Sequence, residues 1–227
     1  MKILFDKKNI RPLSRSFLAF VLLCFTFSSC TKDKDADATL AQVRITNSAE
    51  GSVPQDFFLG TTKVNSSGVI YAHSTDYTRA DIGNYPQAQF KNTGTNTVTA
   101  TLSVTFNPGG YYSVFYLDGG SAIAVTDDRT APQSGKAKVR FINLSSALSS
   151  NVDFAVHAGA TLASGLAYKT ASAYFDVDAA STFSLFTTGS ATALLDIPAT
   201  LQAGHIYTIY ISGATNATIS SQVITEK

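Results

Sequence analysis

An internal repeat is the feature that most constrains how this chain folds. The segment 41–47 (AQVRITN) returns 96 positions later as 137–143 (AKVRFIN), and 109–115 (GGYYSVF) returns 95 positions later as 204–210 (GHIYTIY). A nearly constant offset predicts a duplicated unit of about 90 residues, a usual size for a sandwich of seven short strands. The predicted organisation is a first domain at 41–127, a linker at 128–136 and a second domain at 137–227.

Within each copy, short runs rich in Val, Thr, Tyr and Phe alternate with clusters of Gly, Ser, Asn, Asp and Pro. This alternation is typical of strands and turns, and no stretch has the sustained apolar period and caps of a helix. The predicted fold class is all-β, with two tandem immunoglobulin-like antiparallel β-sandwich domains. The clearest strands of the first copy are expected at 43–47, 97–105, 112–117 and 122–126. Those of the second copy are expected at 139–143, 152–157, 173–177, 182–186, 193–197, 207–211 and 219–224.

In each copy an apolar residue, a glycine and a tyrosine follow one another at steps of three. The residues are Phe106, Gly109 and Tyr112 in the first copy and Leu201, Gly204 and Tyr207 in the second. Immunoglobulin-like sandwiches use this arrangement for a tyrosine corner, whose ring packs inward while its hydroxyl bonds the backbone a few residues upstream. We predict corners at Tyr112 and Tyr207; the alternative is two core tyrosines without that hydrogen bond. Tyr210 is expected on the opposite face of the same strand, and its truncation should cost less than that of Tyr207 if that face is less buried.

The N-terminus has the order of a secretory signal peptide. A basic region at 2–15 precedes an apolar run at 17–27, and two serines then precede Cys30. The apolar run is too short for a permanent membrane span, which needs about 20 residues. The segment 27–30 resembles the bacterial lipobox, where cleavage precedes a cysteine that becomes lipid-modified. We therefore predict a lipoprotein signal peptide at 1–29 and acylation, for example by palmitate, at Cys30.

Cysteine usage supports the lipid anchor. Cys24 leaves with the signal peptide, so Cys30 is the one thiol of the mature chain and has no partner for an internal disulfide. A lone exposed thiol is a liability in an oxidising compartment, and acylation explains its presence. The alternative is an ordinary signal peptide with an incidental cysteine.

The segment after the cysteine predicts where the protein resides. Residues 30–40 are polar and charged and are predicted to form a flexible tether. They also resemble the export signal that carries lipoproteins to the cell surface in the Bacteroidetes group. We expect an outer-membrane protein that is anchored through Cys30 and faces the outside, with periplasm-facing display as the alternative.

The charge balance excludes nucleic acid as a partner. Residues 1–29 hold five of the 17 basic residues but one of the 16 acids, so the mature chain would carry a net charge of −3. Binding to nucleic acid depends on a basic surface that neutralises phosphates. The expected partners are the membrane, through the lipid, and an unidentified glycan or protein.

The sequence contains no metal-ligating or catalytic pattern, and we expect no cofactor. Asp33, Asp35 and Asp37 imitate the start of a calcium loop, but the positions for its glycine and glutamate hold Ala38 and Arg44. A dispersed Ser-His-Asp triad stays open, although no Gly-x-Ser-x-Gly elbow supports it. The histidines lie in different expected elements without the spacing of a zinc site, at His73, His157 and His205.

Other residues allow both a structural and a functional interpretation. Asp176 and Asp178 face the same way on one expected strand, where an exposed polar face is commoner than a hydrolytic or calcium-binding pair. Arg44 and Arg140 occupy equivalent repeat positions, which favours a shared structural role such as an ion pair at the sandwich end. The aromatic residues of one strand pair fit a core better than a sugar-binding face, and they are Tyr111, Phe115, Tyr116 and Tyr210.

A family resemblance rests on three segments. The stretch 122–145 (AIAVTDDRTAPQSGKAKVRFINLS), a Val-Asp-aromatic strand at 152–154 and a Gly-x-x-Tyr-Thr strand at 204–208 resemble the bacterial domain-of-unknown-function family 4397. The resemblance covers the second copy well and is weaker in the first, where Pro-Gln-Asp-Phe at 54–57 replaces the Val-Asp-aromatic strand. Membership implies an extracytoplasmic β-sandwich module without an established activity, and it carries over no catalytic residues.

Three functions are consistent with these features. The leading expectation is a non-enzymatic display or adhesion module of the cell envelope. The first alternative is an accessory glycan-binding lipoprotein of a nutrient-uptake system, which an exposed row of aromatic residues would favour. The second is a hydrolase, which needs polar groups that converge in one pocket.

Overall fold

Short strands make up the secondary structure of the described part of the chain. The structure is a computed structural model that describes residues 39–226. Eighteen strands and no helix form within these residues, in agreement with the predicted all-β fold class. It follows that no described segment is a helix that could cross a membrane.

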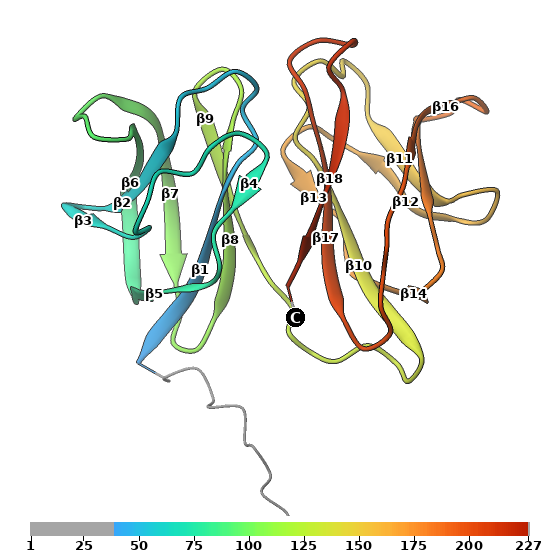
Figure 1. Ribbon diagram of the computed structural model, residues 1–227, viewed down its shortest axis with the longest axis horizontal. Coiled ribbons are helices and arrows are strands. Elements are labelled where there is room, and N and C mark those ends of the chain that lie inside the picture. Colours follow the sequence, from blue (N-terminus) through green and yellow to red (C-terminus); the bar gives the residue numbers. More distant parts are fainter. Residues whose placement is uncertain (1–38, 227) are drawn as a thin grey trace, which may run out of the picture. The chain divides into compact units, whose positions relative to one another are not determined.

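The first half of the described chain contains nine strands (Figure 1). Their bounds are β1 (Leu40–Asn47), β2 (Gln55–Leu59), β3 (Thr62–Lys63), β4 (His73–Ser74), β5 (Thr78–Asp81), β6 (Gly83–Asn92), β7 (Val98–Phe106), β8 (Tyr111–Leu117) and β9 (Ser121–Thr126). One sheet has the order β4-β1-β8-β9, with β5 also paired to β1, and the other has the order β3-β2-β6-β7. The four expected strands all form. The long strand β6 was not among the clearest expected strands. It contains Pro86, which interrupts the strand pattern and lies where the β6–β7 register shifts.

The second half repeats this arrangement with nine further strands. Their bounds are β10 (Lys136–Asn143), β11 (Val152–Val156), β12 (Thr161–Leu166), β13 (Thr170–Ala171), β14 (Phe175–Asp178), β15 (Phe183–Thr187), β16 (Ala193–Ile197), β17 (Ile206–Ser212) and β18 (Ser220–Thr225). The sheets have the orders β13-β10-β17-β18, with β14 also on β10, and β12-β11-β15-β16. The pairs β1–β8 and β10–β17 are parallel and the other strand pairs are antiparallel, so each predicted antiparallel sandwich contains one parallel pair.

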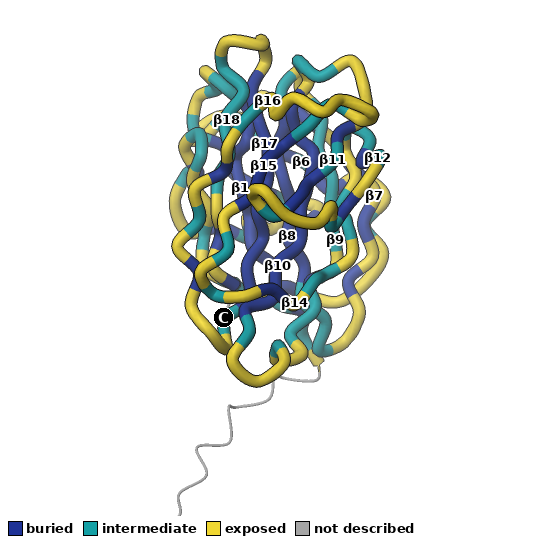
Figure 2. Tube along the Cα trace, turned by 90° about the vertical axis from the view of Figure 1, so that its right-hand side faces the viewer, coloured by how far each residue is buried: buried dark blue, intermediate teal, exposed yellow. Residues whose placement is uncertain are grey.

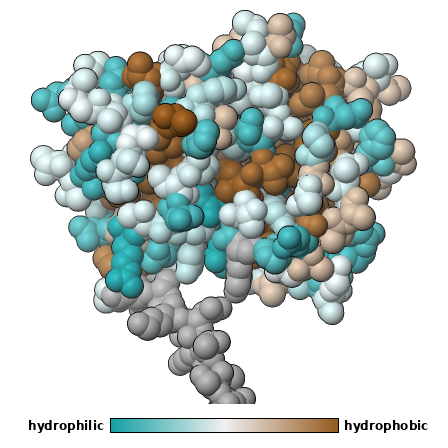
Figure 3. Space-filling view, in the orientation of Figure 1, coloured by the Kyte–Doolittle hydropathy of each residue, from teal (hydrophilic) through white to brown (hydrophobic). Residues whose placement is uncertain are grey.

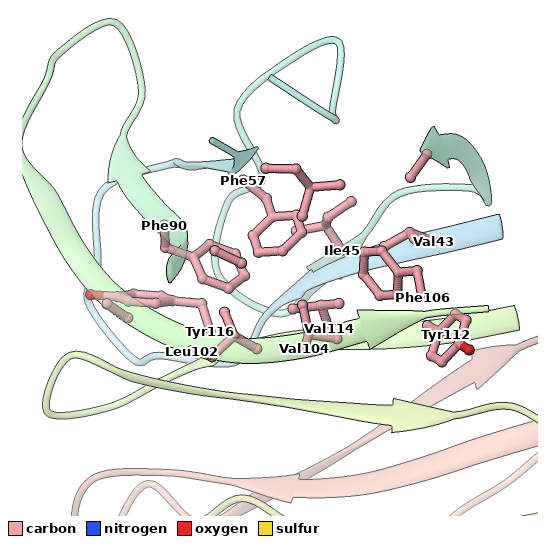
Figure 4. Close-up of a cluster of buried hydrophobic side chains, with 14 of the residues drawn as sticks. Val43, Ile45, Phe57, Phe90, Leu102, Val104, Phe106, Tyr112, Val114 and Tyr116 are labelled. Atoms are coloured by element: carbon pink, nitrogen blue, oxygen red, sulfur yellow. The ribbon is translucent and has the colours of Figure 1, made fainter. Parts of the chain in front are cut away.

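Each half has its own hydrophobic core between its two sheets. In the first half, Phe57 of β2 and Phe90 of β6 point toward side chains of β1 and β8 (Figure 4), and their ring centroids lie 4.9 Å apart. In the second half, Phe141 of β10 stacks on Phe154 of β11 at 4.5 Å. Burying each such side chain stabilises the folded state by about 1.5–3 kcal/mol, so either core is large enough to hold a sandwich together.

A third core, which we call the interface core, joins the two halves. It contains Phe115 and Leu117 from β8, and Ile142, Leu144, Tyr210 and Ile224 from the second half. The ring of Phe115 meets that of Tyr210 edge-on at 5.7 Å. As a result β8, β10 and β17 are buried along nearly their whole length instead of at alternate residues (Figure 2). Tyr210 is 1% exposed, so the condition of a less buried face is not met there.

Both predicted tyrosine corners form. The Tyr112 hydroxyl accepts a hydrogen bond from the backbone N–H of Asn107 at 2.9 Å, and the Tyr207 hydroxyl accepts one from Gln202 at 2.9 Å. Both rings are buried in the cores of their own halves. Each corner therefore fixes the turn that leads into β8 or β17.

The two halves also match in strand register. Asn47 pairs with His73 as Asn143 pairs with Thr170, and Val43 pairs with Thr78 as Val139 pairs with Phe175. The residue before β4 and the residue before β13, Ala72 and Lys169, both adopt a positive φ, of 61° and 64°. This register assigns an equivalent in one half to each residue of these strands in the other.

Candidate functional site

A buried group of charged side chains, which we call the charge cluster, lies where the halves meet. Its centre is the guanidinium of Arg140 on β10, which is 1% exposed. Its Nη2 contacts Asp127 Oδ1 of the first half and lies 3.4 Å from Glu226 Oε1. Its Nε donates to Thr208 Oγ1 at 2.7 Å, and its Nη1 donates to the carbonyl of Thr126 at 2.8 Å. All three nitrogens of Arg140 thus have acceptors, and these come from both halves.

The two acids of the charge cluster have matching surroundings. Asp127 Oδ2 accepts hydrogen bonds from the Tyr77 hydroxyl at 2.6 Å and from Ser113 Oγ at 2.8 Å. Glu226 accepts from the Tyr174 hydroxyl at 3.0 and 3.1 Å and from a threonine hydroxyl of β17. Strand register makes the two sets equivalent. The first half supplies Arg44, Tyr77, Ser113 and Asp127, and the second supplies Arg140, Tyr174, Thr208 and Glu226.

Arg44 is the equivalent of Arg140 but has different contacts. It is 5% exposed, and its Nε and Nη1 have no hydrogen-bond partner among residues 39–226. Its guanidinium lies 4.3 Å from the centroid of the Tyr77 ring, which is a cation–π contact. The ion pair expected at both arginines therefore forms at Arg140 and not at Arg44 within the described chain.

Burial controls the charge states in the charge cluster. It raises the pKa of Glu226 by more than the charge of Arg140 lowers it. Burial alone would lower the pKa of Arg140, but the negative charges around it, that of Asp127 foremost, leave its pKa raised. Burial likewise raises the pKa values of Tyr77 and Tyr174, so both hydroxyls stay protonated and donate. The arginine keeps its charge in a dry environment, and its stability there depends on the acids.

The charge cluster is a connection between the halves. Besides the Arg140–Asp127 contact, the side chain of Arg129 in the linker donates to the backbone carbonyl of Glu226. Glu50 of the first half accepts from the backbone N–H of Ala214 in the second at 3.1 Å. Since Arg140, Asp127 and Glu226 are buried, they offer no surface to a ligand and serve the structure.

A serine, a histidine and an aspartate also meet, on the outer sheet of the second half. His157 Nδ1 lies 3.0 Å from Ser184 Oγ and 3.4 Å from Asp196 Oδ1. Ser184 Oγ donates directly to Asp196 at 2.9 Å and is part of a residue that is 3% exposed. A catalytic triad needs the serine on one ring nitrogen and the acid on the other. In this cluster His157 Nδ1 faces both Ser184 and Asp196, and the hydroxyl of Ser184 donates to Asp196. The geometry is therefore not that of an activated nucleophile.

The other singled-out polar residues lie apart. The ring nitrogens of His73 and His205 face backbone carbonyls in exposed positions, and residues 39–226 contain no group of three or more potential metal ligands. Asp176 and Asp178 are both exposed on β14, and Asp178 pairs with Lys136 at 2.5 Å. They form the polar strand face that was expected.

The strand aromatics belong mainly to cores, as predicted. Phe115 and Tyr210 lie in the interface core, and Tyr116 packs on Phe90 of the first core at 5.3 Å. Tyr111 is partly buried beside Tyr77 at 5.1 Å. The row of exposed aromatics that would favour a sugar-binding face is therefore not formed by these four residues. On the face shown in Figure 3, hydrophobic residues are exposed in small patches among hydrophilic ones.

A polar pocket of about 450 Å³ lies in the first half, and we call it the β4–β5 pocket. It is lined by residues 66–70, by 73–76 and by Thr78. The loop before β4 forms one wall, and β4 with the start of β5 forms another. No sequence signal marks this pocket, because its serines and threonines resemble ordinary loop and strand residues. Cys30, Asp33, Asp35, Asp37 and most of the predicted tether lie outside the described residues.

Fold and contacts define an all-β protein of two sandwich-like halves. The chain belongs to the family described as Domain of unknown function (DUF4397), whose model matches residues 41–155. The match covers the first half and ends within β11. The resemblance was expected to be stronger in the second copy. The match does not delimit two copies of the domain.

One solved structure is also similar to this chain. It is CBMbc, of family CBM26, from Eubacterium rectale Amy13K in complex with maltoheptaose. The two chains are 13% identical over 82% of this chain and 96% of that chain, with a TM-score of 0.27. No curated protein matches the chain.

Proposed function

We propose that this protein is a lipid-anchored module of the bacterial cell envelope that displays a binding surface and performs no catalysis. The observation that carries the proposal is the charge cluster. This group of ionisable side chains is buried and cross-links the two halves, which gives a joined scaffold rather than a reactive site. The hydrogen-bond arrangement of Ser184, His157 and Asp196 argues against the hydrolase alternative, because the serine donates to the aspartate and not to the histidine.

The anchor is the second part of this proposal. Its support is the order of basic, apolar and small residues before Cys30 and the polar tether after it. A single acyl chain gives marginal membrane binding, whereas two or more chains anchor a protein stably. We propose attachment to the outer membrane with the β-sandwich halves facing the cell surface, and periplasmic display as the alternative.

Fatty-acid labelling tests the anchor. Cells that express the full chain are fed a radiolabelled or clickable fatty acid, and the protein is then isolated. We expect label in the wild-type protein and in Cys24→Ala, because Cys24 is removed with the signal peptide, and none in Cys30→Ala. Equal labelling of Cys30→Ala and wild type would contradict the proposal. Protease treatment of intact cells then distinguishes surface display from periplasmic display.

The accessory glycan-binding function is the second candidate, and the β4–β5 pocket favours it. The pocket is open to solvent and lined by hydroxyl groups, a carboxylate and a histidine. These groups can donate to and accept from the hydroxyls of a sugar. The candidate therefore rests on this pocket and not on the strand aromatics.

A further inference from the structure

The duplicated architecture separates residues that the fold needs from residues that it does not. A side chain that makes a structurally required contact in one half should have an equivalent that makes the same contact in the other half. The β4–β5 region and the β13–β14 region have the same strand register, so they can be compared position by position.

Several structural hydrogen bonds around the β4–β5 pocket are found at the equivalent positions of the second half. Thr75 Oγ1 accepts a hydrogen bond from the N–H of Ile45 at 3.1 Å, and the equivalent Ser172 Oγ accepts from Phe141 at 2.9 Å. The residues with positive φ before β4 and β13 both donate their N–H to the carbonyl of an asparagine at 2.8 Å. The tyrosines that follow, Tyr77 and Tyr174, both bond an acid of the charge cluster.

The polar groups that face the pocket do not recur. Ser74, Asp76 and Thr78 have as equivalents Ala171, Ala173 and Phe175. The second half thus folds with two alanines and a phenylalanine where the first half has two hydroxyls and a carboxylate. Ser74 Oγ shares a hydrogen bond with Thr46 Oγ1 at 2.8 Å, whereas Asp76 and Thr78 are polar groups that the fold does not require.

Most of these polar groups are free to bind a ligand. Asp76 is exposed and Thr78 is half-buried, and neither side chain forms a hydrogen bond or an ion pair with another described residue. The same holds for the side chains of Ser66 and Ser67 on the opposite wall. Ile70, which is 48% exposed, adds an apolar surface beside them.

The lining limits the chemistry of the ligand. An apolar molecule would desolvate hydroxyls and a carboxylate without giving them hydrogen bonds. An anionic molecule would meet Asp76 and no lysine or arginine among the lining residues. A calcium ion takes six to eight oxygen ligands and favours several carboxylates, of which the pocket has one. A neutral polyhydroxylated molecule satisfies every one of these conditions, and a volume of about 450 Å³ lies within the usual range for ligand pockets.

From this comparison we infer that the β4–β5 pocket binds a neutral saccharide. Asp76 accepts hydrogen bonds from sugar hydroxyls, the serines and Thr78 donate and accept, and Ile70 covers one C–H face of the ring. The inference deepens the proposed function and rests on it, since it assigns the site and the ligand class of the displayed binding surface.

Binding to immobilised sugars tests the inference. The full chain is solubilised in a detergent without a sugar headgroup and applied to neutral trisaccharides of glucose, galactose, mannose and N-acetylglucosamine. Oligogalacturonate serves as the anionic comparison. We expect binding to at least one neutral trisaccharide. Asp76→Ala should weaken it by about tenfold or more, since a hydrogen bond to a charged group is lost. The alanine is the residue that the second half carries at this position, so the melting temperature should not change.

Matched variants make the result decisive. Asp176→Ala removes an exposed aspartate in the second half and should bind as the wild type does. If Asp76→Ala melts lower than the wild type, the double variant Ser66→Ala/Ser67→Ala replaces it, and loss of binding at an unchanged melting temperature supports the inference. Absence of binding to all neutral trisaccharides, preference for oligogalacturonate, or full binding by the pocket variants would overturn it. Fatty-acid labelling of Cys30 is independent of these outcomes, so failure of the saccharide site and failure of the anchor are told apart.

Discussion

Removing the carboxylate of Asp127 is the sharpest perturbation of the charge cluster. The side chain of Asp127 is 0% exposed and that of its partner Arg140 is 2% exposed. In Asp127→Ala, Arg140 keeps a buried charge with one acid at 3.4 Å, and the hydroxyls of Tyr77 and Ser113 lose their acceptor. Removing one partner of a buried ion pair costs about 3–5 kcal/mol. We therefore expect the free energy of unfolding to fall by about that amount.

Urea unfolding of the full chain measures this loss. Circular dichroism is the suitable signal, because the chain has no tryptophan. With an m-value of about 2–3 kcal/mol/M, the midpoint should fall by roughly 1–2.5 M. The matched control is Asp178→Ala, which removes an exposed acid with an exposed lysine partner and should cost about 0–1 kcal/mol. If Asp127→Ala is no more costly than Asp178→Ala, the charge cluster does not stabilise the fold as argued.

Three further perturbations test other parts of the structure. Tyr207→Phe removes a hydroxyl that accepts a hydrogen bond and should cost about 1 kcal/mol of unfolding free energy. Tyr210→Phe removes a buried hydroxyl without a partner in the described chain and should be neutral or stabilising. The reverse order of stabilities in urea melts would refute both assignments. The raised pKa of Glu226 means that the native state keeps this proton to a higher pH than the unfolded chain does, so the free energy of unfolding should decline as pH rises above about 4.5 until Glu226 ionises in the native state. Glu226→Gln should flatten that decline in urea midpoints taken from acid to neutral pH, and an unchanged decline would contradict it. The fragment 137–227 should keep a strand spectrum because it has its own core, but it should melt well below the full chain because its share of the interface core becomes exposed; equal melting temperatures would show that the halves do not stabilise each other.

Much of the fold could be predicted because it follows from local pattern. Alternating apolar residues and turn clusters predicted the strands, and the repeated Gly-x-x-Tyr spacing predicted the corners at Tyr112 and Tyr207. The burial of Tyr210 was not predicted, because it depends on the packing of its sheet against the other half. The run of β-branched and aromatic residues along β17 was a signal for burial on both faces.

The charge cluster and the pocket were harder to predict. Asp127 and Glu226 directly follow strand ends, and nothing in their sequence neighbourhood distinguishes them from solvated residues. Their equivalence is visible only from strand register. The offset between the two copies changes from one repeated segment to the next, so it cannot be read from the sequence. For the same reason the difference between Asp76 and its counterpart Ala173 became visible only after the strands were aligned by their pairing.

The packing of a sheet on both faces has a consequence for how this sequence can vary. Along β7, buried and exposed residues alternate, so every second position should accept most substitutions in a saturation mutagenesis experiment. Along β8 nearly every position is buried, and tolerance should stay low from one residue to the next. Sequence drift should therefore accumulate in the outer sheets and loops.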